Sequence, residues 1–382
     1  MMSRIISVDE KILKNILLGI ALGACFLLVL LLGKNTLHAE EFDEDYFSYM
    51  QNVEEGQTME VDNSIVYVQD DLTIEYGAEL IFNGDCYLED DIFIQNGGIL
   101  TVNNELINAG KIHLENGATL NINANLVNNG EIENYGEINI SGSMANYSTV
   151  YNYMNINVGE RAELSNTGEI KGNGGLNVKG EFDNAGSYLA GSIFVENTLD
   201  NKGSILLENA NLNNEGEINN YKDGRISIVN GCFYNESNES KLVNKGNFDS
   251  SNASKIYNQG LVEIKAEGHL AIADLYNYNE VVNHGTFDIN GAFDSRNGRL
   301  VNYGALNNLG LMNFTYYSDF EQSKESTYTG NMYECVYSYG ATAIFNGSLA
   351  GYVVVSLASI AVCLIVVRIR IVKKAKKEKN GD

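Results

Sequence analysis

Asp183 and Asp200 are the pair of side chains best placed for chemistry in this 382-residue chain. Each directly precedes the asparagine of a recurring pattern, in the segments F-D-N-A-G and L-D-N-K-G. If these copies stack as neighbouring strands, the two carboxylates lie about 5 Å apart, near the carboxylate separation of a retaining glycosidase. The alternative is a solvated acidic ladder, which we favour because the chain has no tryptophan to shape a substrate site and few arginines.

The other residues that could hold a metal or cofactor lack the necessary spacing. Three of the five cysteines, Cys86, Cys232 and Cys335, are far apart in the polar middle of the chain and form no C-x-x-C or C-x-x-H motif. The four histidines share no metal-ligand spacing, and the glycine-rich segment 171–176 lacks the aspartate of calcium-binding nonapeptides. We therefore expect no metal site and no cofactor.

The elements that position the two aspartates are copies of the motif apolar-x-Asn-x-Gly-x-apolar. The residue two before the asparagine is apolar in all fifteen copies, the residue two after it is glycine in twelve, and the fourth after it is aliphatic, Phe or Met in thirteen. The motif asparagines are Asn108, Asn128, Asn134, Asn146, Asn152, Asn166, Asn184, Asn201, Asn214, Asn220, Asn244, Asn258, Asn283, Asn302 and Asn308. Such a register indicates a repeat architecture.

The spacing of the copies predicts coils of 18–20 residues, each with two or three short strands that bury their apolar sides only by stacking. About thirteen coils over residues 64–315 would form an all-β, single-stranded parallel β-helix. The positions two before and four after the motif asparagine, such as Leu164, Ile170, Leu199 and Ile205, should point inward. Asparagine and glycine are the residues that tolerate left-handed conformations at corners, and stacked asparagine side chains can bond to one another up the column. Glu131, Glu137, Glu169 and Glu217 should form one outward column.

This pattern resembles the single-stranded parallel β-helices of bacterial surface proteins, of the adhesin and filamentous-haemagglutinin type. The resemblance rests on the N-x-G corners with their apolar flanks, and it covers residues 64–315. It implies a rod-like β-solenoid and carries no functional residues across. Pectate-lyase-like and polygalacturonase-like enzymes share the architecture and place carboxylates on neighbouring coils, which is why Asp183 and Asp200 stay under consideration.

The first 39 residues resemble a secretion signal. Arg4, Lys11 and Lys14 precede the apolar run 16–32, and T-L-H-A-E-E follows it. The run is long enough for an uncleaved anchor to be the alternative. Leu22 to Cys25 resembles a lipoprotein cleavage box, but seven further apolar residues follow the cysteine, and we favour a plain helix-lining cysteine.

The C-terminal end predicts a membrane anchor. Residues 349–367 contain no charge and match the length needed to cross a bilayer. Seven basic residues between 368 and 379 follow, and such a cationic flank stays cytoplasmic. Whether or not the first segment is cleaved, residues 40–348 should face outward, with one span after cleavage and two without it.

The expected organisation has six parts. A signal or anchor (1–39) is followed by an acidic cap segment (40–63), the solenoid (64–315), a tyrosine-rich cap and juxtamembrane segment (316–348), the transmembrane helix (349–367) and a basic tail (368–382). Residues 40–348 carry 14 basic and 46 acidic side chains, a net charge of −32, which excludes nucleic acid as a partner.

The sequence thus predicts a membrane-anchored structural or adhesive surface protein, without enzymatic activity, that meets glycans or proteins at the cell surface. The competing hypothesis is an anchored polysaccharide-cleaving lyase or glycosidase that uses Asp183 and Asp200.

Overall fold

The computed structural model describes residues 52–62, 65–251, 253–315, 317–331, 333–336 and 342–345. Of these, residues 334–336 and 342–345 are described by their backbone alone. The predicted signal or anchor 1–39, the predicted transmembrane helix 349–367 and the tail 368–382 lie outside the described residues. Within the described ranges, no helix has the length and apolar character needed to cross a membrane.

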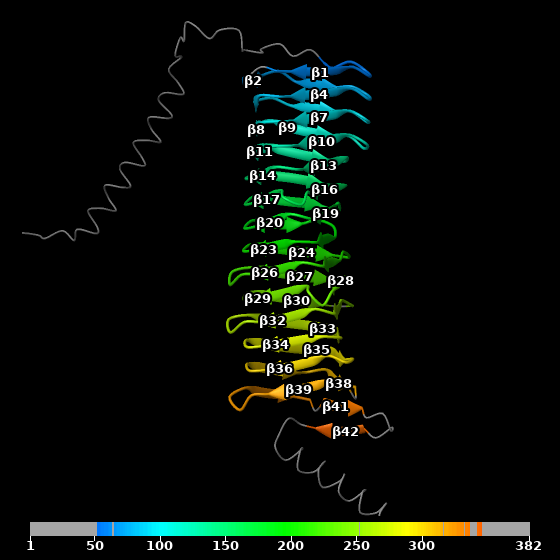
Figure 1. The fold of residues 1–382 in the computed structure, drawn as a ribbon, viewed down its shortest axis with the longest axis vertical. Coiled ribbons are helices and arrows are strands. Elements are labelled where there is room, and N and C mark those ends of the chain that lie inside the picture. Colours follow the sequence, from blue (N-terminus) through cyan, green and yellow to red (C-terminus); the bar gives the residue numbers. More distant parts are fainter. Residues whose placement is uncertain are drawn as a thin grey trace, which may run out of the picture. The chain divides into compact units, whose positions relative to one another are not determined.

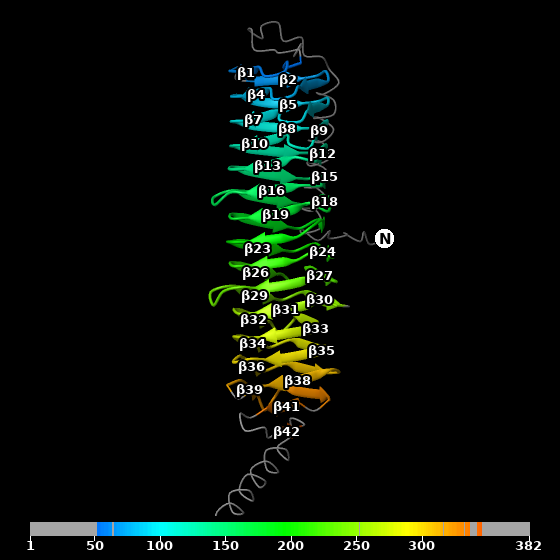
Figure 2. The same ribbon diagram turned by 90° about the vertical axis from the view of Figure 1, so that its right-hand side faces the viewer.

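The described chain forms strands β1 to β42, which coil into a solenoid with three faces (Figures 1 and 2). Face 1 is a 14-stranded parallel sheet. Its strands are β2 (Ile65–Val68), β5 (Asp85–Leu88), β8 (Glu105–Asn108), β11 (Asn125–Asn128), β14 (Ser143–Asn146), β17 (Glu163–Asn166), β20 (Glu181–Asn184), β23 (Thr198–Asn201), β26 (Glu217–Asn220), β29 (Lys241–Asn244), β32 (Leu261–Ile264), β34 (Glu280–Asn283), β36 (Arg299–Asn302) and β39 (Asp319–Gln322).

Face 2 follows face 1 in every coil. Its strands are β3 (Leu72–Ile74), β6 (Ile92–Ile94), β9 (Lys111–Leu114), β12 (Glu131–Asn134), β15 (Thr149–Asn152), β18 (Glu169–Gly172), β21 (Ser187–Leu189), β24 (Ser204–Glu208), β27 (Arg225–Val229), β30 (Asn247–Ser251), the first parts of β33 (His269–Asn277) and β35 (Thr286–Ser295), β37 (Ala305–Asn308) and β40 (Thr327–Gly330).

Face 3 closes each coil. Its strands are β1 (Thr58–Val61), β4 (Glu79–Phe82), β7 (Ile99–Val102), β10 (Thr119–Ile122), β13 (Glu137–Ile140), β16 (Asn155–Val158), β19 (Gly175–Val178), β22 (Ile193–Val195), β25 (Leu212–Asn214), β28 (Cys232–Asn235), β31 (Lys255–Asn258), the second parts of β33 and β35, β38 (Leu311–Phe314) and β41 (Tyr333–Val336).

The predicted parallel β-solenoid is confirmed, with about thirteen turns. Register partners on face 1 are 17 residues apart at the closest, between Glu181 and Thr198, and 24 at the widest, between Glu217 and Lys241. Thirteen strand steps correspond to a rod about 60 Å long. Each coil has three strands, and the six-residue pairs of motif asparagines are the ends of adjacent strands around one corner.

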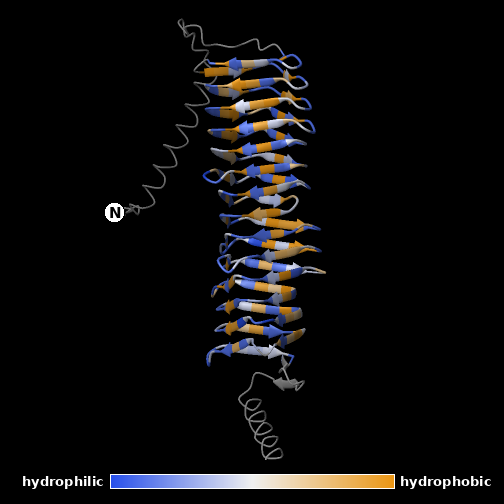
Figure 3. Ribbon diagram, turned by 45° about the vertical axis from the view of Figure 1, so that its right-hand side comes forward, coloured by the Kyte–Doolittle hydropathy of each residue, from blue (hydrophilic) through white to orange (hydrophobic). Residues whose placement is uncertain are grey.

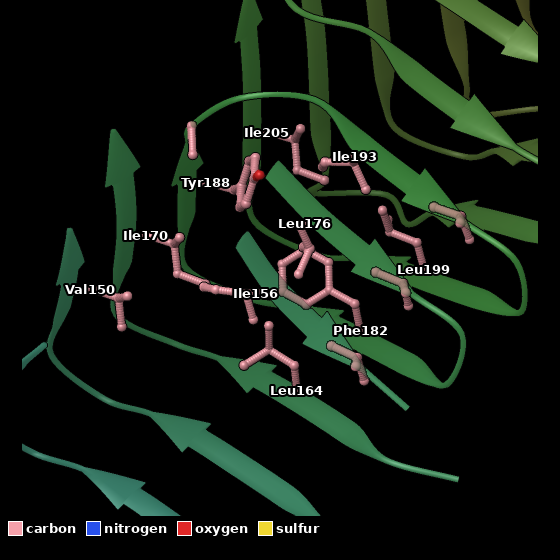
Figure 4. Close-up of a cluster of buried hydrophobic side chains, with 14 of the residues drawn as sticks. Val150, Ile156, Leu164, Ile170, Leu176, Phe182, Tyr188, Ile193, Leu199 and Ile205 are labelled. Atoms are coloured by element: carbon pink, nitrogen blue, oxygen red, sulfur yellow. The ribbon is translucent and has the colours of Figure 1, made fainter. Parts of the chain in front are cut away.

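The core is one continuous column of apolar side chains along the inside of the coils. Figure 3 shows hydrophobic and hydrophilic residues alternating along the strands of the stacked coils. Most strands show the alternation of half-buried and buried residues that a sheet with one solvated face requires. The four predicted inward residues Leu164, Ile170, Leu199 and Ile205 are fully buried. They pack with Phe182 and Tyr188 of the intervening coil (Figure 4).

The motif asparagines form hydrogen-bonded ladders inside the corners. The longest ladder lies at the end of face 1, where each Nδ2 donates to the Oδ1 of the next coil at 2.7–2.8 Å. Its members are Asn108, Asn128, Asn146, Asn166, Asn184, Asn201, Asn220 and Asn244. A second ladder at the end of face 3 joins Asn214, Asn235, Asn258 and Asn277 at 2.8–2.9 Å. The predicted bonding of asparagines up the column is confirmed.

The ladders have a direction, which leaves the first acceptor of each long ladder without a donor. In the preceding coil, the register partner of Asn108 is Leu88, and that of Asn214 is Val195. Neither apolar side chain can donate a hydrogen bond to the Oδ1 of the asparagine in the next coil. Both Oδ1 atoms are buried without a hydrogen-bond partner in the described part of the chain. In the shorter ladder of Asn283 and Asn302, the backbone N–H of Gly285 supplies the missing bond to Asn283.

The left-handed residues in the described part of the chain are asparagines and glycines, as expected, but the motif glycines are not among them. None of the twelve has a positive φ; the described left-handed residues include Asn209, Asn230 and Asn297 at other corners. A Cβ at Gly130 would lie 1.9 Å from the carbonyl oxygen of Gly110, and one at Gly186 would lie 2.1 Å from that of Gly168. Glycine is required at these positions because the backbone of the preceding coil approaches too closely for any side chain.

The expected single outward column of glutamates is also wrong. Glu131 and Glu169 lie on face 2, Glu137 lies on face 3, and Glu217 lies on face 1. The N-x-G motif recurs at more than one corner of each coil, so the residue that follows its glycine begins strands of all three faces. The acidic side chains are therefore spread around the rod.

The parallel columns continue on both sides of the expected solenoid limits, residues 64 and 315. At the N-terminal side, β1 starts face 3, and Val53 forms a parallel bridge with Ile74 on face 2. At the C-terminal side, β39, β40 and β41 extend the three faces by one coil. The antiparallel strand β42 (Thr342–Phe345) then pairs with β41 and ends the stack of described strands (Figure 1).

Candidate functional site

The structure brings Asp183 and Asp200 together. Asp183 lies on β20 and Asp200 on β23, and the two are direct register partners on the outer side of face 1. Parallel neighbours are separated by about one strand spacing, 4.7–4.9 Å. The stacking that the sequence predicted for this pair therefore occurs.

Both aspartates belong to a network of neighbouring side chains. The Nζ of Lys202 donates to Oδ2 of Asp183 at 2.7 Å. Asp200 accepts hydrogen bonds from Nδ2 of Asn219 at 3.0 Å and from the hydroxyl of Tyr221 at 3.2 Å. The Lys202 ammonium also lies 5.5 Å from the centre of the Tyr221 ring. One carboxylate is thus matched by a cation, and the other is held by two neutral donors.

The electrostatics of this network keep its donors protonated. The hydrogen bond to Asp183 is the main reason that the pKa of Lys202 is raised. Burial, followed by the charge of Asp200, raises the pKa of the Tyr221 hydroxyl. A carboxylate with an ion-pair partner and a protonated tyrosine suit a cross-coil clamp, whereas a glycosidase needs one protonated carboxyl as general acid.

Among the hollows of the described surface are two on face 3, and neither of these is lined by Asp183 or Asp200. The larger, of about 530 Å³, is lined by Tyr234, Asn238, Tyr257, Gln259 and Tyr278, and we call it the tyrosine hollow. The segment 236–240 contributes Asn238 to one wall, and together with the long corner 221–224 it makes the coil from Glu217 to Lys241 the longest on face 1. Figure 2 shows this loop projecting beside β29.

Two of the tyrosines that line the tyrosine hollow, Tyr234 and Tyr257, belong to a stack of three rings. Tyr234, Tyr257 and Tyr276 occupy the same outward position on three successive coils, with ring centres 5.1 and 5.2 Å apart and planes inclined by 7° and 14°. Because the rings face one another along the rod, they turn their edges and hydroxyl groups toward solvent. The stack therefore offers hydrogen bonds together with a narrow apolar rim.

No ionisable acid or base lines the tyrosine hollow apart from its tyrosines. The hydrogen bond with Cys232, together with burial, raises the pKa of Tyr234 to about 12, so this hydroxyl is neutral at physiological pH. Asn238 and Gln259 contribute amides, and both are exposed. The lining is thus neutral, rich in donors and acceptors, and partly aromatic.

The smaller hollow, of about 350 Å³, lies along an outward amide ladder on the same face. Asn139, Asn157 and Asn177 line it, and their side chains are hydrogen-bonded in sequence at 2.9 and 2.7 Å. Lys179 and Glu196 lie at its rim with 3.6 Å between Nζ and Oε1. These amides already bond one another, which leaves fewer free groups for a ligand than in the tyrosine hollow.

The described histidines and cysteines form no metal site. No group of three or more His, Cys, Asp or Glu side chains in the described ranges is placed to hold a metal ion. His113 pairs with Glu133 at 2.7 Å, His269 pairs with Asp288 at 2.8 Å, and His284 stacks on Tyr303. Cys86 is buried, which raises its pKa to about 12 and makes it a poor nucleophile.

Sequence reasoning missed the tyrosine stack. Tyr234, Tyr257 and Tyr276 each directly precede a ladder asparagine, in C-F-Y-N, K-I-Y-N and D-L-Y-N. Asn235 and Asn277 have no glycine two residues later and are not among the fifteen motif asparagines, so two of the three tyrosines were overlooked. The shared aromatic residue before Asn was the signal that could have shown a column.

Comparison of the chain with family models, with curated proteins and with solved structures finds no match. The likeness to adhesin-type β-helices is therefore one of architecture, which the coil geometry supports.

Proposed function

We propose that this protein is a membrane-anchored surface protein whose β-solenoid rod binds neutral glycan chains through the tyrosine hollow. The observation that carries the binding proposal is the lining of the hollow by three tyrosines and two amides with no carboxylate or cation. Sugar hydroxyl groups are hydrogen-bond donors and acceptors without charge, and they match such a surface. The acidic rod around it would repel polyanionic ligands.

The anchoring part of the proposal is supported by the two apolar segments of the sequence, 16–32 and 349–367, and by the basic tail. With the C-terminus cytoplasmic, the rod faces outward. The coils that follow the hollow, from β35 to β41, would then separate it from the membrane end of the rod by about three strand spacings, or about 15 Å.

The alternative, a polysaccharide-cleaving enzyme, has one observation in its favour, which is the register pairing of Asp183 and Asp200. Against it stands the ion pair in which Nζ of Lys202 lies 2.7 Å from Oδ2 of Asp183, because this carboxylate already has a cationic partner on the protein. Neither aspartate lines the tyrosine hollow or the smaller hollow. We therefore favour binding over cleavage.

Protease treatment of intact cells tests the anchoring. We expect residues 40–348 to be digested while an epitope fused after Asp382 survives until the membrane is permeabilised. Loss of the epitope from intact cells would contradict a cytoplasmic C-terminus.

Substitutions in the tyrosine hollow test the binding. Asn238→Ala and Gln259→Ala should weaken retention on a glycan array, because each removes an exposed amide from the lining. Asn129→Ala is the matched control, since Asn129 is an exposed corner amide several coils away. Equal retention by all three variants would place the binding surface elsewhere.

A further inference from the structure

The C-terminal coils carry an uncharged, exposed apolar corner between faces 2 and 3. Leu309 and Leu311 are 67% and 62% exposed, whereas the other exposed aliphatic residues among those described, Ile65, Met154 and Leu189, are 37–40% exposed. Residues 305–312 and 327–331 of this corner contain no ionisable acid or base except Tyr328. On a rod with a strongly acidic surface, this corner is a local exception.

The corner lies beside the point from which the chain leaves the solenoid. Met312 on β38 is the register partner of Tyr333 on β41, and Tyr333 is in turn the partner of Phe345 on β42. Phe345 is therefore two strand spacings, about 10 Å, from the strand that begins with Leu311. Figure 1 shows β38, β41 and β42 in succession at the C-terminal end of the rod.

Only three residues, 346–348, separate Phe345 from the apolar segment 349–367. A fully extended chain spans at most about 3.5 Å per residue, so the start of this segment lies within about 14 Å of β42. If residues 349–367 cross a bilayer, the last coils of the solenoid must lie at or near its headgroup layer. A rod inclined toward the Leu309 corner would bring that corner into the layer.

We propose that the corner formed by Leu309 and Leu311 contacts the lipid headgroup and upper acyl region, so that the rod leans on the membrane. The inference rests on the anchoring part of the proposed function. Exposed leucines gain by leaving water for the bilayer interface, and the absence of carboxylates from the corner removes the repulsion from anionic lipid that the rest of the rod would experience.

The chain contains no tryptophan, so a single introduced indole reports its own surroundings. The test uses the full chain in nanodiscs whose phosphatidylcholine carries brominated acyl chains, which quench indole fluorescence on contact. Leu309→Trp and Leu311→Trp probe the corner. Leu189→Trp and Tyr147→Trp, at exposed positions in the middle of the rod, are the controls. Leu357→Trp probes the predicted span itself.

We expect strong quenching for Leu357→Trp, clear quenching with a blue-shifted emission for Leu309→Trp and Leu311→Trp, and none for the two controls. Quenching of Leu357→Trp alone would overturn the membrane contact while leaving the anchor intact. Absence of quenching at Leu357→Trp would refute the anchor and the contact with it. A blue shift at the corner without bromine quenching would show that a second copy of the chain covers the leucines, which would also overturn the proposal.

Discussion

Removing one side chain from the middle of the long asparagine ladder should destabilise the solenoid far more than removing an asparagine that bridges neighbouring coils on its surface. Asn166 is fully buried and makes three hydrogen bonds. Its Oδ1 accepts from Asn146 at 2.8 Å, and its Nδ2 donates to Oδ1 of Asn184 at 2.8 Å and to the carbonyl oxygen of Ser187 at 3.2 Å. Asn166→Ala abolishes all three.

The magnitude follows from what is left without a partner. Asn146 keeps two other acceptors for its Nδ2, the carbonyl oxygens of Ser148 and Glu169. Oδ1 of Asn184 loses its donor and becomes a buried unsatisfied acceptor, which costs about 1–3 kcal/mol. With the net loss from the other two bonds, we expect Asn166→Ala to lower the free energy of unfolding by about 2–4 kcal/mol.

Asn103 supplies the matched control. It also bonds to the coils on both sides, with 2.7 Å to Asn83 and 2.7 Å to Asn123, but it is exposed. Asn103→Ala should cost less than about 0.5 kcal/mol, because water replaces the lost partners. Urea unfolding of the ectodomain followed by far-ultraviolet circular dichroism, with hydrogen exchange of the amides near Ser187, measures both. Equal costs for the two variants would refute the assignment of stability to the buried ladder.

Three further predictions concern single side chains. Leu199→Asp should cost more than about 4 kcal/mol, because it leaves a cavity and an unpaired buried charge. Thr198→Lys, on the outer side of the same strand and between Glu181 and Glu217, should unfold at nearly the wild-type urea concentration. Similar midpoints for the two variants would mean that the inward column is misassigned. Burial tends to raise the pKa of Glu133, but hydrogen bonds from Lys111 and His113 outweigh it and lower the pKa. The stabilisation by Glu133 is therefore complete above the unfolded pKa of about 4.3 and is lost as the pH falls through the folded value. Glu133→Gln should thus destabilise the protein at pH 7 and have less effect near pH 3. The exposed Glu163→Gln is the control in the same denaturation series. A loss of stability that is independent of pH would contradict the ion-pair assignment. Burial raises the pKa of Cys86 to about 12, so this thiol should resist maleimide at pH 8 in the native protein and react in urea. Peptide mass mapping measures the labelling of Cys86. Rapid labelling of the native protein would show that the first coils open readily.

The repeat class could be predicted from the sequence because each coil of the solenoid repeats the same local pattern of residues. Inward positions such as Leu164 and Ile170 are apolar, and the corner asparagine recurs in each coil, so the parallel stack, the coil length and the ladders follow from neighbouring residues alone. The role of the glycines could not be read in this way. Gly130 is constrained by a carbonyl oxygen twenty residues earlier, and the sequence alone does not reveal that distance.

In the candidate site, too, only the features that follow the repeat could be predicted from the sequence. The pairing of Asp183 with Asp200 was predictable, since both occupy one position of the motif. Their surroundings were not, because Lys202 comes from the following corner and Tyr221 from a coil of different length, with a delayed glycine at Gly224. The tyrosine hollow depends on the insertion 236–240, and an insertion is where a repeat pattern loses its predictive value.

A screen of the ectodomain against cell-wall and host glycans, with retention and reducing-end release recorded in the same wells, tests most directly the claim that the rod binds without cleaving. We predict saturable retention that Asn238→Ala and Gln259→Ala weaken, no release of reducing ends, and unchanged retention by Asp183→Asn and Asp200→Asn. Release that disappears in the folded Asp183→Asn and Asp200→Asn proteins would contradict the binding account and establish the enzyme.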